Sequence, residues 1–159
     1  MCNKRSKQLH LLSILIIGTF LFVSCGLAGL GDWEYEFPNN YEMWRVNARN
    51  IVIGYREPGS SVLRSSGIGV DAHVIAFCFN DQFVCAKRVT VGDADKPIDY
   101  DNPQFYIIDT MEQAVYGPFE DEERFSDELN HLDITGLGNW ESTSPAPKGA
   151  IFPSFLSCN

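Results

Sequence analysis

The chain has 159 residues and a formal net charge of −9; 45% of its residues are hydrophobic and 13% are aromatic. This apolar content excludes wholesale disorder. An acidic chain without a basic block is also poorly suited to bind nucleic-acid phosphates, so we expect no nucleic-acid partner. The first 24 residues hold three bases and no acid, so the other 135 carry nine bases against 21 acids, a net charge of −12. That length is enough for one domain with its own core.

The N-terminus has the pattern of a secretory signal. Residues 1–8 are basic, and residues 9–23 form an apolar run in which His10 is the one strongly polar side chain. A helix that crosses a bilayer needs about 20 apolar residues. This run of fifteen is shorter, and its length and basic flank are typical of a signal peptide.

Ser24-Cys25-Gly26 ends this run and resembles the lipobox of bacterial lipoproteins. The resemblance implies that a lipid such as palmitate is attached to the Cys25 thiol, and that cleavage makes Cys25 the first mature residue. Phe22 departs from the Leu or Val that is usual three positions before the cysteine. An ordinary signal peptide that contains a cysteine and an uncleaved N-terminal anchor are the alternatives.

The sequence predicts four segments: a lipoprotein signal peptide at 1–24, the lipidated Cys25 with a flexible tether at 25–31, a single globular domain at 32–138, and a Ser/Pro-rich C-terminal tail at 139–159. A six-residue tether reaches about 20 Å when extended. We therefore expect the domain to lie close to the cell membrane, on its extracytoplasmic side. Its negative charge would be repelled by anionic headgroups, so the lipid is expected to hold it there.

The domain is predicted to be α+β, with a mostly antiparallel sheet of successive hairpins and one late helix packed on it. Trp33 and Tyr35 alternate with acids, a period of two that indicates a strand. Apolar runs separated by turn residues predict three hairpins, at 41–46 with 51–55, at 73–79 with 83–91, and at 104–109 with 114–116. Short connections favour a meander, and a small barrel is the alternative.

The late helix is expected after the acidic run of residues 120–123. Acidic side chains are favourable at the positive end of a helix. Phe125, Leu129 and Leu132 are spaced four and three apart, which places them on one apolar face.

The pairing within the 73–91 hairpin depends on its loop. A four-residue loop from Asn80 to Phe83 places Cys78 opposite Cys85, whereas a two-residue loop pairs Cys78 with Phe83. Outside the cytosol, two thiols that face each other can form a disulfide; buried free thiols are the alternative. Cys158, beside the terminus, is expected to be exposed or linked elsewhere. The thiols and histidines lack the spacing of a zinc site, and no cofactor is expected.

Five stretches of the sequence share one further likeness: Cys25-Gly26, residues 31–39 (GDWEYEFPN), residues 41–47 (YEMWRVN), residues 105–110 (FYIIDT) and residues 115–119 (VYGPF). Together they resemble a family of small bacterial lipoproteins of unknown function. The likeness covers most of the mature chain. It implies membrane lipidation and a compact domain, and it carries no catalytic residue across.

Asp71 and His73 are the candidates for catalysis, because a carboxylate that orients an imidazole is half of a hydrolase relay. However, no serine lies in a G-x-S-x-G motif. A small membrane-tethered hydrolase using this pair is therefore the alternative function, and a strand-edge histidine is the structural explanation.

Asp93, Asp95, Asp99 and Asp101 are the candidates for metal binding, since carboxylate oxygens suit a cation such as Ca²⁺. Counted from Asp93, however, the sixth and twelfth positions of an EF-hand loop are Ile98 and Gln104 rather than Gly and Glu. A solvated acidic loop is the alternative.

The preferred function is a non-enzymatic binding or interaction module held at the membrane. An acidic surface suits a basic protein partner. Aromatic side chains can anchor such a contact where they are exposed; the candidates are Trp33, Tyr41, Trp44, Tyr55 and Tyr100. Packing in the core is the alternative for these rings, and we favour it for Trp44.

Overall fold

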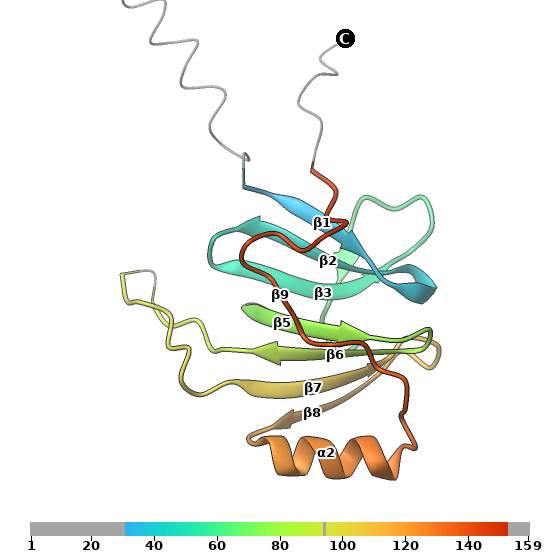
Figure 1. The fold of residues 1–159 in the computed structure, drawn as a ribbon. Helices are drawn as coiled ribbons and strands as arrows, with labels where there is room; N and C mark the ends of the chain where they lie inside the picture. The colour runs from blue at the N-terminus through green and yellow to red at the C-terminus, as the bar shows by residue number, and fades with distance from the viewer. Residues whose placement is uncertain (1–30, 94, 153–159) are drawn as a thin grey trace, which may run out of the picture. The chain divides into compact units, whose positions relative to one another are not determined.

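The structure is a computed structural model that describes residues 31–93 and 95–152. In this part of the chain, nine strands form two antiparallel sheets, and one α-helix follows the eighth strand (Figure 1). The elements are β1 (Trp33–Glu36), a 3-10 turn η1 (Pro38–Asn40), β2 (Tyr41–Asn47), β3 (Asn50–Arg56), β4 (Leu63–Arg64), β5 (Val74–Phe79), β6 (Phe83–Arg88), β7 (Gln104–Asp109), β8 (Ala114–Phe119), α2 (Glu122–His131) and β9 (Glu141–Ser142).

The α+β fold with a late helix is confirmed, and its strands are divided between two sheets. The first sheet has the order β1-β2-β3-β4, and the second has the order β8-β7-β6-β5-β9. Each of the three predicted hairpins is present, as β2–β3, β5–β6 and β7–β8. Neither sheet closes on itself within the described residues, so the alternative of a small barrel is wrong.

The main core lies between the two sheets. Trp33, Met43 and Ile53 enter it from the first sheet, and Phe77 and Ile108 enter it from the second. All five are at most 1% exposed. Apolar side chains at every second position give each of these strands a face that packs in this core, which explains why the alternating sequence folds into strands here.

A second core lies on the opposite face of the second sheet, under α2. Phe125 of the helix packs there against Phe105 of β7, with ring centroids 5.3 Å apart, and Leu129 and Leu132 contact the same cluster. The helix begins after Asp121, whose side chain accepts a hydrogen bond from the backbone N–H of Arg124 at 2.8 Å. This N-cap satisfies one of the otherwise unpaired N–H groups of the first turn.

The register of the β5–β6 hairpin follows from the four-residue loop. Asn80 stabilises the turn, because its side-chain oxygen accepts hydrogen bonds from the backbone N–H groups of Gln82 and Phe83 at 2.9 and 2.7 Å. Phe79 therefore pairs with Val84, and Cys78 lies opposite Cys85.

Residues 139–152, which the sequence assigned to the C-terminal tail, pack along the domain; we call them the C-terminal strap. The strap forms β9 on the free edge of β5, and the buried hydroxyl of Thr143 donates to the carbonyl of Val74 at 3.0 Å. Ile151 then pairs with Glu34 of β1. The strap thus covers the β5 edge of the second sheet and the β1 edge of the first sheet, in agreement with the path of the red ribbon in Figure 1.

Gly69 lies where the chain passes close to β3, and a larger residue cannot fit there. A Cβ at this position would be 2.2 Å from the carbonyl oxygen of Ile53. We expect Gly69→Ala to lower the free energy of unfolding by about 1–3 kcal/mol, the usual cost of overpacking. Urea unfolding measures the change. Gly92→Ala is the matched control, because a Cβ there meets nothing within 4 Å; equal stability of the two variants would contradict the described packing.

Candidate functional site

His73 is buried beneath the loop that connects β6 and β7. It is 5% exposed, and its ring lies edge-on to that of Tyr100 with centroids 6.5 Å apart. Nδ1 has no hydrogen-bond partner among the described residues. Burial lowers the pKa of His73, and the nearby charges of Arg45 and Arg49 act in the same direction, although a hydrogen bond with the Arg49 backbone opposes them. The ring is therefore neutral at pH 7.

Asp71 is not hydrogen-bonded to His73 in the described structure. Its side chain is turned to another partner, since Oδ1 accepts a hydrogen bond from the Ser65 hydroxyl at 2.6 Å. The residue is exposed. A carboxylate orients an imidazole for catalysis by bonding to a ring nitrogen, and in this structure the carboxylate of Asp71 is bonded to the loop of Ser65 instead.

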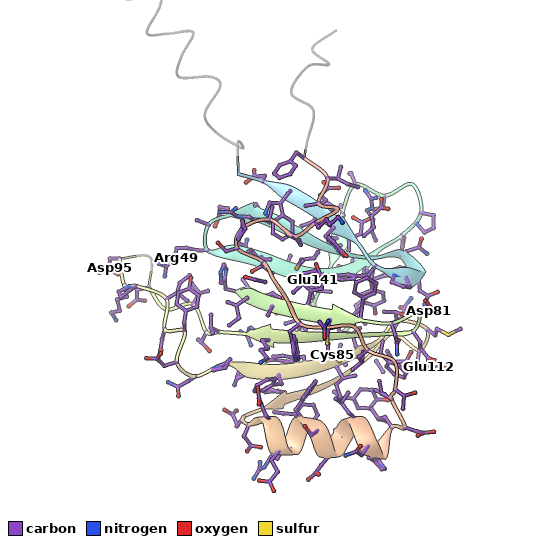
Figure 2. All side chains as sticks on the ribbon, viewed as in Figure 1. Arg49, Asp81, Cys85, Asp95, Glu112 and Glu141 are labelled. Carbon is purple, nitrogen blue, oxygen red and sulfur yellow. The ribbon has the colours of Figure 1, made fainter. Side chains whose placement is uncertain are left out.

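Arg49 fastens the acidic loop to the turn between β2 and β3. Its guanidinium donates to the carbonyl oxygens of Lys96 at 2.8 Å, Asp93 at 3.1 Å and Gly92 at 3.5 Å. Figure 2 shows Arg49 and Asp95 at the same end of the domain. These bonds use the loop carbonyls, which are also the kind of oxygen that a Ca²⁺ ion takes as ligands.

The four candidate aspartates are spread along this loop. Asp93 forms an ion pair with Lys96 at 2.8 Å. Asp99 accepts hydrogen bonds from the backbone of Asp101 at 2.9 Å and from the side chain of Asn102 at 3.2 Å. Across the described ranges, no group of three His, Cys, Asp or Glu side chains is placed to hold a metal ion.

Cys78 and Cys85 meet in the second core, where both are buried and unbridged. Figure 2 shows Cys85 in the interior of the domain. A hydrogen bond between the two side chains lowers the pKa of Cys78, and the same bond together with burial raises the pKa of Cys85. Directly opposed residues on antiparallel strands have Cα atoms about 4.5–5.5 Å apart, a separation that a disulfide accepts.

Sequence reasoning missed an ion pair between a buried glutamate and a partly exposed arginine on the outer face of the first sheet. Glu42 is 5% exposed. One of its oxygens binds Arg56 at 2.5 Å, and the other accepts a hydrogen bond from the indole N–H of Trp44 at 2.7 Å. A cleft of about 410 Å³ opens beside this pair, under residues 57–61. The alternation of β2 signals that Glu42 faces away from the core. Its partner could not be read from the sequence, because Glu42 lies opposite Gly54 in the register and reaches Arg56 diagonally.

The five aromatic candidates divide by burial. Trp33 and Tyr41 are at most 1% exposed and belong to the core, and burial raises the pKa of Tyr41 to about 12. Trp44 is partly exposed and belongs to neither core, so the expectation that it packs in the core is wrong. Tyr55 is partly exposed and packs against the main core. Tyr100 is 56% exposed. A contact with a partner can therefore use Tyr100 and the accessible part of Trp44, whereas Trp33 and Tyr41 stabilise the fold.

The lowered pKa of His73 makes a prediction about stability and pH. Because the unfolded histidine takes up a proton near pH 6.5 and the buried one does so only at lower pH, the free energy of unfolding falls as the pH drops below about 6.5. Above that pH, both the folded and the unfolded histidine are neutral, so the free energy of unfolding carries no penalty from His73. We expect His73→Gln to make the loss between pH 7.5 and 5.5 shallower in denaturant titrations.

His131→Gln is the control for this prediction. His131 is exposed on α2 and pairs loosely with Glu128 at 3.5 Å. A variant of His131 that flattens the pH profile as strongly as His73→Gln would contradict the assignment of the effect to His73.

The opposed thiols generate a second prediction. In protein isolated from an oxidising compartment under thiol-blocking conditions, we expect Cys78 and Cys85 to be joined, which would add about 2–3 kcal/mol of stability by the chain-entropy estimate for so short a loop. Trypsin leaves both cysteines in one peptide, Ser65–Lys87, because no Lys or Arg lies between. Formation of the disulfide removes one hydrogen from each thiol, so the mass of this peptide should be that of the unblocked peptide less two hydrogens. A peptide with two blocked thiols would contradict the bond.

Two predicted positions, Cys25 and Cys158, lie outside the described residues. Within those residues, no helix has the length and apolar character needed to cross a membrane.

The comparison with known families supports the resemblance noted in the sequence. The family described as "Protein of unknown function (DUF3997)" matches residues 38–137, more than half of the chain and most of the folded domain. No curated protein and no solved structure matches the chain. The resemblance to a family of unknown function is therefore confirmed. The chain belongs to the DUF3997 family.

Proposed function

We propose that this protein is a cell-envelope lipoprotein, held on the extracytoplasmic side of the membrane by a lipid on Cys25, and that its domain is a non-enzymatic binding module. One observation carries the proposal: Ser24-Cys25-Gly26 directly follows a basic head and an apolar run, and the folded domain starts soon afterwards at β1. A lipobox in this position leaves the mature protein with an anchor, a short tether and a domain.

Two features of the domain support a binding role. The cleft beside Glu42 and Arg56 offers a polar surface, because the Arg56 guanidinium has N–H donors beyond the one bound to Glu42.

The second feature is the exposed side of α2, which is acidic, with Glu122, Glu123 and Asp127 exposed to solvent. Such a surface attracts a partner of opposite charge. The partner we propose is therefore a basic protein.

The anchor is tested by metabolic labelling with a palmitate analogue in a bacterial host. We expect the wild-type chain to be labelled and Cys25→Ala to be unlabelled and released from the membrane fraction, because the thiol that carries the lipid is gone. Cys158→Ala is the matched control and should be labelled like the wild type. Equal labelling of the wild type and Cys25→Ala would refute the lipoprotein assignment.

A further inference from the structure

The first and last described residues of the domain meet at the same strand. Gly31 lies two residues before the start of β1, and Ile151 pairs with Glu34 through two backbone hydrogen bonds, of 2.9 and 2.7 Å. Because this bridge is antiparallel, Phe152 continues along β1 toward its beginning. Figure 1 shows β1 and the end of the C-terminal strap together at one end of the domain.

Exposed apolar side chains gather at this end. The described residues include seven large hydrophobic side chains with high exposure, and three of them lie here: Val46 is 49% exposed, Ile151 is 48% and Phe152 is 57%. A groove of about 240 Å³ lies beside Val46 and is lined by residues 32–34 and 44–46. Ile151 and Phe152 follow the other side of β1, because Ile151 pairs with Glu34 and β2 pairs with the opposite edge of the strand. We call Trp44, Val46, Ile151 and Phe152 the β1-end patch.

The position of the tether indicates what covers this patch. Cys25 and Gly31 are six residues apart, so the lipid is attached within about 20 Å of the start of β1. We propose that the β1-end patch docks on the lipid surface into which the acyl chain inserts. This inference rests on the proposed lipidation of Cys25. The apolar contact would add a second point of attachment and fix the orientation of the domain, since apolar side chains gain free energy when they leave water.

Charges around the patch determine which lipid it suits. Asp32 and Glu34 border the groove, and Arg45 is the one base among the residues that line it. Carboxylates are repelled by the negative potential of anionic headgroups. The patch therefore fits a surface of zwitterionic phospholipid, and anionic lipid should weaken the contact.

Hydroxyl-radical footprinting of the mature lipidated chain tests the docking. In phosphatidylcholine vesicles we expect Val46 and Phe152 to be labelled several-fold less than in the unlipidated Cys25→Ser chain free in solution. Met111 and Tyr100 are internal references, because they are 65% and 56% exposed and lie outside the patch. Their labelling should be unchanged. Vesicles that contain phosphatidylglycerol should give less protection than pure phosphatidylcholine.

Desorption kinetics give a second readout. We expect the lipidated double variant Val46→Ser, Phe152→Ser to transfer between phosphatidylcholine vesicles about tenfold faster than the wild type, because two half-exposed apolar side chains no longer contribute to binding. Val62→Ser is the matched control, since Val62 is 61% exposed in the segment between β3 and β4. It should transfer at the wild-type rate.

The outcomes separate this inference from the proposed function. A chain that takes up no lipid would overturn both. A lipidated chain whose Val46 and Phe152 stay as reactive in vesicles as in solution, or whose double variant transfers at the wild-type rate, would overturn the docking alone. Protection of the patch in the free Cys25→Ser chain would also overturn it, because a second copy or the chain's own last residues would then cover these side chains.

Discussion

The second sheet carries apolar side chains on both faces, and covering both of them is the constraint on which the rest of the fold depends. In β5, Phe77 points into the main core while its neighbour Cys78 points into the second. A sheet of this kind cannot leave either face in water without losing the free energy of burial. The first sheet covers one face and α2 covers the other. The three layers therefore follow from the alternation within β5, β6 and β7.

Local elements of this fold could be predicted from the sequence because their signals are local. The hairpins and α2 are encoded by periods of two and 3.6 and by turn residues within each segment. The division of the strands into two sheets could not be predicted in this way, because it depends on contacts between residues far apart in the chain. The C-terminal strap shows the difference: its Ser/Pro-rich composition resembles that of a loose tail, but Thr143 is buried and bonded to Val74.

The candidate site residues show the same contrast between what local sequence predicts and what contacts between distant residues decide. Asp71 and His73 are neighbours in sequence, but the carboxylate is bonded to Ser65 and the imidazole is packed under Tyr100. The pairs that do form join separate strands: Glu42 with Arg56 across β2 and β3, and Cys78 with Cys85 across β5 and β6. The thiol pair could be anticipated as one of two registers, and Asn80 selects it by stabilising a four-residue loop. No residue in the sequence gives a comparable signal for Glu42 and Arg56.

The C-terminal strap also has a consequence for an anchored domain. An edge strand held by one neighbour is easily detached, and β1 has four residues and one strand neighbour, β2. A tether joined to Gly31 would act directly on that strand. The pairing of Ile151 with Glu34 holds β1 on its second side, and β9 ties the same segment to the second sheet. If the domain is anchored as proposed, a force on the tether would act on both sheets through the C-terminal strap.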